Sequence, residues 1–127
     1  MRKPGKRVKT MVLVLLADDN LASCSALRLL LSNRLDLFEI AAVGDWSSLK
    51  ALAQRGQPEI ILFDWELPGG PACAELGVLR EISPRTHLIA LSARPEAEVE
   101  AHHAGVDAFI AKGDPPRKVL DVVRQFI

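Results

Sequence analysis

The sequence has few cysteines, no excess charge of either sign and no long apolar run. Its two cysteines, Cys24 and Cys73, fall at helix-like positions without the spacing of metal ligands. We therefore expect buried thiols in a reducing cytosol rather than a disulfide or a zinc site. No apolar stretch approaches the roughly 18 to 20 residues that a membrane-spanning helix needs. The sequence thus predicts a cytoplasmic protein that has no contact with a membrane.

The charges balance overall but are unevenly distributed. Sixteen basic and sixteen acidic residues give a net charge of zero, which does not indicate a general nucleic-acid-binding surface. Residues 1–10 contain five basic residues and no acidic one. We expect residues 1–10 to be a disordered basic tail and residues 11–127 to form one compact domain.

The start of the chain has the outline of a secretory signal peptide, because a basic segment precedes the apolar residues 11–17. Two observations argue against that interpretation. Asp18 and Asp19 follow the apolar run at once, and no A-x-A-like cleavage site is present. We interpret the run as the first strand of a sheet.

Short apolar runs alternate with segments of helical periodicity, which is the pattern of βαβ units around a parallel sheet. Strands are predicted near residues 12–17, 39–44, 59–64, 87–92 and 107–111. Helices are predicted from Asn20, after Asp45, over residues 72–82, over residues 95–104 and from Pro115. Right-handed crossovers then favour an α/β fold: a flavodoxin-like, doubly wound, five-stranded parallel sheet of order 2-1-3-4-5 with five helices.

Some residues receive a structural interpretation only. The helix predicted over residues 95–104 carries three glutamates and few large apolar residues, so we expect it to pack weakly and move easily. Trp46 is expected to pack a helix against the sheet. The three histidines, His87, His102 and His103, are expected at the surface.

Residues suited to phosphoryl chemistry follow four of the predicted strands. Asp18 and Asp19 follow the first strand, Asp64 ends the third, Ser92 ends the fourth and Lys112 follows the fifth. Because the carboxyl ends of parallel strands share one edge of the sheet, we expect these side chains to meet at the point where the winding reverses.

The grouping predicts a divalent metal ion and a phosphoryl group. Crowded carboxylates repel one another without a cation, and Mg²⁺ prefers hard oxygen ligands. Mn²⁺ could substitute for it. Asp64 could then act as the nucleophile toward phosphorus, while the Lys112 ammonium and the Ser92 hydroxyl neutralise charge on the transferring oxygens.

These motifs resemble those of the receiver domains of two-component response regulators. The resemblance covers about residues 11–127. It rests on the acidic pair within residues 16–20, the acceptor strand and loop over 60–69, the hydroxyl within 90–93 and the lysine that ends 105–112. It implies that Asp64 accepts a phosphoryl group from a sensor histidine kinase or a phosphotransfer protein.

The resemblance also implies roles for the neighbouring residues. Asp19, Asp64 and the backbone carbonyl of Glu66 would bind Mg²⁺, with Asp18 acting partly through water. Ser92 and Phe109 would be the switch pair that moves inward on phosphorylation. The altered state would be displayed on the fourth helix, the fifth strand and the fifth helix.

One departure from the family pattern bears on partners. Many receivers have proline after the conserved lysine, whereas Gly113 follows Lys112 here. This variation resembles receivers that precede a helix-turn-helix output, so a DNA-binding output domain outside this chain is one expected partner and a second copy of the chain is another.

Two charged residues are predicted to control access of water to the acceptor. Glu66 and Arg94 lie two residues beyond Asp64 and Ser92, positions from which side chains can overhang the site. Their opposite charges are expected to pair across its opening and to hinder the in-line water that hydrolysis requires.

Two alternative functions stay open at this point. A pseudo-receiver that acts only through protein contacts would not need Asp64, Ser92 and Lys112, all of which are present. A small aspartyl-phosphate phosphatase would use an Asp-x-Asp pair, but residue 66 is Glu and no cap domain is present. We therefore expect a regulatory phosphoacceptor rather than an enzyme, and turnover of a phosphomonoester would separate the two.

Overall fold

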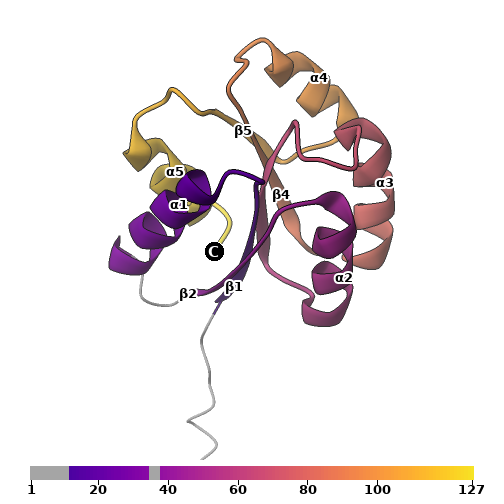
Figure 1. The fold of residues 1–127 in the computed structure, drawn as a ribbon, viewed down its shortest axis with the longest axis horizontal. Coiled ribbons are helices and arrows are strands. Elements are labelled where there is room, and N and C mark those ends of the chain that lie inside the picture. The colour runs from indigo at the N-terminus through magenta and orange to yellow at the C-terminus, as the bar shows by residue number, and fades with distance from the viewer. Residues whose placement is uncertain (1–11, 35–37) are drawn as a thin grey trace, which may run out of the picture.

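The computed structural model describes residues 12–34 and 38–127, in which five strands alternate with five helices (Figure 1). The strands are β1 (Val12–Ala17), β2 (Phe38–Val43), β3 (Ile60–Asp64), β4 (His87–Ser92) and β5 (Ala108–Ala111). The helices are α1 (Leu21–Arg34), α2 (Trp46–Gly56), α3 (Ala72–Ile82), α4 (Ala97–Ala104) and α5 (Pro116–Arg124). The predicted basic tail, residues 1–10, lies outside the described residues. So does Leu35, which the periodicity of the helix predicted from Asn20 places on the same face as Cys24, Leu27 and Leu31.

The five strands form one parallel sheet in the order β2-β1-β3-β4-β5, which confirms the predicted topology. Every residue of β3 is buried, because this strand lies inside the sheet and has helices on both faces. In the register, Ala17 of β1 lies opposite Phe63 of β3, and Asp64 lies opposite Leu91 of β4. The ends of these three strands therefore come together at one edge.

Helices cover both faces of the sheet (Figure 1), and an apolar layer lies between the sheet and the helices on each face. On one face α2, α3 and α4 pack over a layer that includes Trp46, Phe63 and Leu76. On the other face α1 and α5 cover a layer that includes Leu31 and Val123. Trp46 is 1% exposed and its ring lies 5.4 Å from that of Phe63, so its predicted role between helix and sheet is confirmed.

Helix boundaries follow from local chemistry. Asn20 and Asp45 act as N-caps, because their Oδ1 atoms accept hydrogen bonds from the backbone N–H groups of Ser23 at 3.0 Å and Ser48 at 2.7 Å. The hydrogen bond from Ser48 lowers the pKa of Asp45. Helix α4 begins at Ala97 rather than at the expected residue 95, because the residues before it form a turn in which Ala97 N–H donates to the Arg94 carbonyl.

Helix α4 contacts the core through small side chains. Its buried residues are Ala97 and Ala101, while Val99 is 66% exposed. The positive φ of Gly105, +104°, ends the helix in a conformation that glycine adopts without a steric cost.

One expectation about a single residue is wrong. Cys24 is buried, but Cys73 is exposed. Helix α3 buries Ala72, Leu76 and Leu79, and residue 73 lies about 100° around the helix from residue 72, which turns it toward solvent. His87 is only partly exposed, because it stacks on Phe126 with ring centroids 4.7 Å apart.

Among the helices that the structure describes, no helix has the length and apolar character needed to span a membrane.

Candidate functional site

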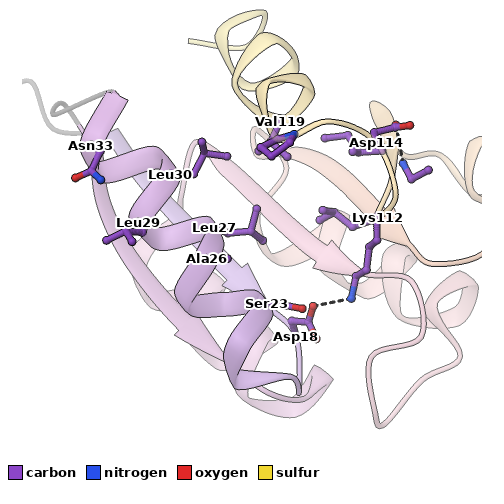
Figure 2. Close-up of a pocket in the computed structure, with 14 residues that line it drawn as sticks. Asp18, Ser23, Ala26, Leu27, Leu29, Leu30, Asn33, Lys112, Asp114 and Val119 are labelled. Carbon is purple, nitrogen blue, oxygen red and sulfur yellow. Dashed lines mark hydrogen bonds and ion pairs between the residues drawn. The ribbon is translucent and has the colours of Figure 1, made fainter.

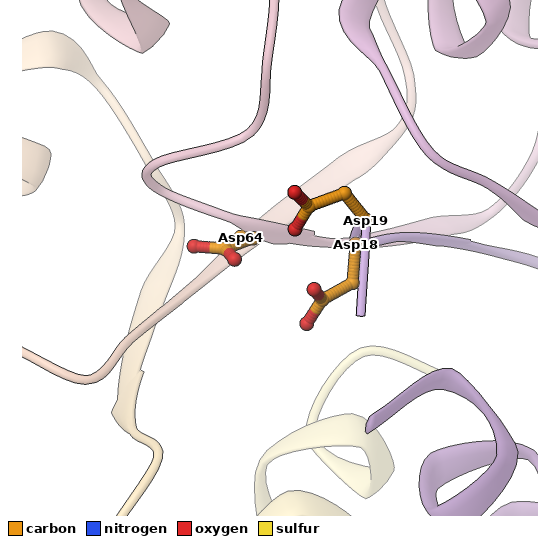
Figure 3. Close-up of side chains that lie close together, drawn as sticks. All are labelled: Asp18, Asp19 and Asp64. Atoms are coloured by element: carbon orange, nitrogen blue, oxygen red, sulfur yellow. The ribbon is translucent and has the colours of Figure 1, made fainter. Parts of the chain in front are cut away.

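Three carboxylates meet at the carboxyl edge of the two central strands. Asp18, Asp19 and Asp64 each offer an oxygen atom, and these atoms all lie within 4.8 Å of one another (Figure 3). Asp18 and Asp64 are buried, with 5% and 8% of their surface exposed, whereas Asp19 is exposed. The cluster thus has two buried carboxylates and one that faces solvent.

Backbone groups orient the two buried carboxylates. The Oδ1 atom of Asp18 accepts a hydrogen bond from Asn20 N–H, and that of Asp64 accepts one from Glu66 N–H, both at 2.9 Å. The backbone of Asp18 is itself held by the sheet, because its N–H donates to the Val43 carbonyl at 3.0 Å. One oxygen of each carboxylate is therefore held by the backbone, and the other is left for a cation.

Lys112 places a positive charge on that second oxygen. Its Nζ donates to Asp18 Oδ2 at 2.8 Å and to Asp64 Oδ2 at 3.1 Å. The backbone of Lys112 extends the β4–β5 pairing, because its N–H donates to the Ser92 carbonyl at 2.8 Å. Burial alone would lower the pKa of Lys112, but the hydrogen bonds to Asp18 and Asp64 outweigh it, so the pKa is raised and the ammonium stays charged.

The donor set fits a hard divalent cation. The cluster has three carboxylates and one ammonium group, which contacts two of them, so it carries an excess of negative charge. Asp19 makes no hydrogen bond through its side chain within the described residues. Carboxylate oxygens that converge in this way, with one open to solvent, are the ligands that Mg²⁺ takes together with water.

Ser92 lies beside the cluster, and its hydroxyl donates to another carboxylate. The residue is fully buried, and its Oγ lies 3.0 Å from Glu66 Oε1. Glu66 also accepts hydrogen bonds from Arg94 Nε at 3.1 Å and Nη2 at 2.8 Å, so the ion pair expected between these residues is present. This pairing raises the pKa of Arg94. The hydrogen bond between Ser92 and Glu66 was not predicted.

The aromatic residues near the site contact helix α4 and the core. Trp65 follows Asp64 directly and is 5% exposed, and its indole Nε1 donates to Glu100 Oε1 of α4 at 3.3 Å. Phe109 is partly buried and packs against the layer under α2, α3 and α4. The contact between Trp65 and Glu100 spans 35 residues and has no signal in the sequence.

A cleft between α1 and α5 reaches the site from the face of the sheet that these two helices cover (Figure 2). Its volume is about 520 Å³. Its walls include Leu27 and Leu30 of α1 and Val119 of α5, and one end reaches Asp18 and Lys112. This cleft also was not predicted, since it depends on how two helices far apart in the sequence pack together.

The model of the response regulator receiver domain matches residues 14–124. The chain belongs to this family. The assignment agrees with the parallel five-stranded order, with the carboxylate cluster at the ends of β1 and β3, and with the lysine that follows β5. The expected membership of the receiver domains of two-component signalling is therefore confirmed.

The receiver is similar to a transcriptional regulatory protein of Bacillus subtilis strain 168, YxjL. The two are 26% identical over 121 residues, which are 91% of this chain and 54% of YxjL. The receiver thus spans about half the length of this relative.

Solved structures share the fold of this receiver. The chemotaxis response regulator CheY4 of Vibrio cholerae superposes with a TM-score of 0.82 at 20% identity, covering 93% of this chain and 100% of CheY4. A CheY-like receiver from Methanospirillum hungatei JF-1 gives 0.79 at 23% identity, covering 91% and 92%. A response regulator from Burkholderia pseudomallei, solved with a phosphorylated aspartic acid and a calcium ion, gives 0.74 at 21% identity, covering 86% and 64%.

Proposed function

We propose that this receiver accepts a phosphoryl group on Asp64 from a sensor histidine kinase or a phosphotransfer protein, in a reaction that depends on Mg²⁺. The observation that carries the proposal is the Lys112 ammonium, which binds Asp18 and Asp64 at once inside a cluster of three carboxylates. One residue of that cluster, Asp64, is a buried carboxylate with a cation on its Oδ2 atom, which suits a nucleophile toward phosphorus.

The carboxylates of Asp18, Asp19 and Asp64, with the backbone carbonyl of Glu66, would hold the metal ion, and Mn²⁺ could replace Mg²⁺ there. When bound, the ion supplies positive charge that neutralises the phosphoryl oxygens and the carboxylates around them. The excess negative charge of the cluster favours such an ion.

In the transfer, a carboxylate oxygen of Asp64 bonds to phosphorus while the bond from phosphorus to the donor's imidazole nitrogen breaks. The leaving nitrogen keeps the electron pair and takes up a proton, and Asp64 becomes an acyl phosphate. Lys112 Nζ, already 3.1 Å from Asp64 Oδ2, neutralises charge on the transferring group. The Ser92 hydroxyl donates a hydrogen bond to another of its oxygens.

We assign the response to the same residues. Ser92 and Phe109 move inward on phosphorylation, and α4, β5 and α5 display the new state. An output domain that binds DNA is the proposed partner, because YxjL, of which the receiver spans about half, is a transcriptional regulatory protein. A second copy of the chain is a further proposed partner. The proposed role is regulatory and cytoplasmic, and the chemistry is limited to self-catalysed phosphorylation and dephosphorylation.

Incubation with phosphoramidate and Mg²⁺, followed by mass spectrometry, tests the proposal. We expect a single label on Asp64 that survives acid and is lost in base. The label should be absent in Asp64→Asn and in the presence of EDTA, and unchanged in Asp121→Asn, which removes an exposed carboxylate of α5 outside the cluster. A label on a histidine would refute the mechanism. The absence of any label would favour a pseudo-receiver, and repeated turnover of a phosphomonoester would favour a phosphatase.

A further inference from the structure

Three residues near the acceptor form a closed set of hydrogen bonds around Ser92. The Ser92 hydroxyl donates to Glu66, at 3.0 Å from Oε1 and 3.2 Å from Oε2. Arg94 holds Glu66 through two guanidinium N–H groups and donates its backbone N–H to Ser92 Oγ at 3.0 Å. A hydroxyl has one proton, and here that proton is committed to Glu66.

We propose that Glu66 is a positioning residue that holds the Ser92 hydroxyl in a resting orientation, which phosphorylation of Asp64 must overcome. The proposal rests on the proposed function, because it assumes that Ser92 donates to the phosphoryl group. It goes beyond control of water access: Glu66 acts on the switch residue itself.

The contacts explain why this hold is effective. Ser92 is fully buried, so water cannot easily replace the lost partner when the hydroxyl turns away. The acceptor is a carboxylate, and hydrogen bonds to ionised groups are about twice as strong as neutral ones. Donation by Arg94 N–H to the oxygen of the same hydroxyl fixes the direction of its proton further.

The geometry also provides a route for release. The Glu66 side chain is 42% exposed, so its carboxylate can turn away from Ser92 without opening the core. Glu66 is close to the acceptor, because its backbone N–H donates to Asp64 Oδ1. A phosphoryl group on Asp64 adds negative charge beside the Glu66 carboxylate, which disfavours the resting arrangement and frees Ser92.

A simpler explanation gives Glu66 no positioning role, since its charge alone would repel an incoming anion. The two explanations differ in their dependence on Ser92. Repulsion by charge acts whether or not residue 92 has a hydroxyl, and it is lost equally in Glu66→Gln and Glu66→Ala. A positioning role requires the hydroxyl, and it is partly kept by glutamine, whose side-chain oxygen still accepts a hydrogen bond.

Binding of beryllofluoride, an analogue of the phosphoryl group, tests this inference in the presence of Mg²⁺, with Trp65 fluorescence as the signal. We expect Glu66→Ala to lower the Kd about tenfold and Glu66→Gln about threefold. In a Ser92→Ala background, Glu66→Ala should leave the Kd unchanged. Glu96→Ala is the matched control, because Glu96 contacts Arg94 at 3.8 Å on the exposed side and makes no hydrogen bond to Ser92.

Equal effects of Glu66→Ala with and without the Ser92 hydroxyl would overturn the proposal in favour of charge alone, as would an equal effect of Glu96→Ala. A second measurement needs no ligand: the coupling between Glu66→Ala and Ser92→Ala in the free energy of unfolding. Zero coupling would show that the hydrogen bond does not hold Ser92, even if beryllofluoride binds as expected. Failure of the wild type to bind beryllofluoride, with no label on Asp64, would instead refute the proposed function and this inference with it.

Discussion

Replacing Lys112 with methionine removes the ammonium that contacts both buried carboxylates of the site. At 2.8 Å and 3.1 Å, two such contacts amount to about 1.5 and 1.3 kcal/mol at the dielectric constant of water, and to more inside the protein. The Lys112 side chain is 27% exposed, so the loss of stability should lie between the loss for a surface ion pair and the loss for a buried one. We expect Lys112→Met to lower the free energy of unfolding by about 2 kcal/mol in EDTA.

Urea unfolding, followed by the fluorescence of Trp46 and Trp65, measures this loss. Mg²⁺ should reduce the difference between the variant and the wild type, because the ion neutralises the carboxylates that the lysine no longer reaches. Lys118→Met is the matched control: its pair with Asp114 is exposed and 3.5 Å long, so we expect a loss below about 1 kcal/mol.

The pH dependence of the Lys112 pair provides an independent check. The pKa of Lys112 is raised above its ordinary 10.5 in the folded protein, so its contribution to stability is complete below pH 10.5 and is lost as the pH rises through the folded pKa. The difference between wild type and Lys112→Met should therefore be constant from pH 7 to pH 10. A variant as stable as the wild type in EDTA, or a difference that Mg²⁺ does not reduce, would refute this account of the cluster.

Three further outcomes are expected. Arg94→Ala should shorten the lifetime of phosphorylated Asp64, measured by loss of label, without preventing phosphorylation; a longer or unchanged lifetime would show that the ion pair does not hinder water. Asp45→Ala should lower the Tm at pH 7, and Asp45→Asn, which keeps an acceptor oxygen at the cap but removes the charge, should lower it less. Because the pKa of Asp45 is lowered, its contribution is present above pH 3.8, and the effect of alanine should shrink as the pH falls further. Thr86→Val should lower the free energy of unfolding, measured in urea, by about 1 to 3 kcal/mol. The reason is that Thr86 is 2% exposed and its hydroxyl donates to the Pro58 carbonyl at 2.6 Å. No loss of stability would mean that this carbonyl finds another hydrogen-bond donor.

The sequence was sufficient for the parts of the site that depend on strand ends. Asp18 and Asp64 each stand where an apolar run stops, and parallel strands bring such ends to one edge whatever the helices do. The strand order follows from right-handed crossovers in the same way. These features need only the pattern of apolar residues, which is strong because the central strands are buried on both faces.

Features that depend on packing between distant segments could not be predicted. The Ser92 hydroxyl donates its hydrogen bond to Glu66 because of the side-chain conformations adopted in the folded protein. The exposure of Cys73 depends on how α3 is rotated against the sheet, because residue 73 lies about 100° around the helix from the buried Ala72. A sequence pattern fixes which face of a helix is apolar but leaves such rotations open.

The small side chains beneath α4 bear on the free energy that the proposed switch would need. Ala97 and Ala101 bury only methyl groups, so sliding this helix over the sheet would give up little apolar contact. Converting a two-state switch from 1:99 to 99:1 needs about 5.5 kcal/mol of differential interaction. In the proposed switch, a helix held through methyl groups would leave the two arrangements close in energy, so the charge of a single phosphoryl group on Asp64 would be enough to choose between them.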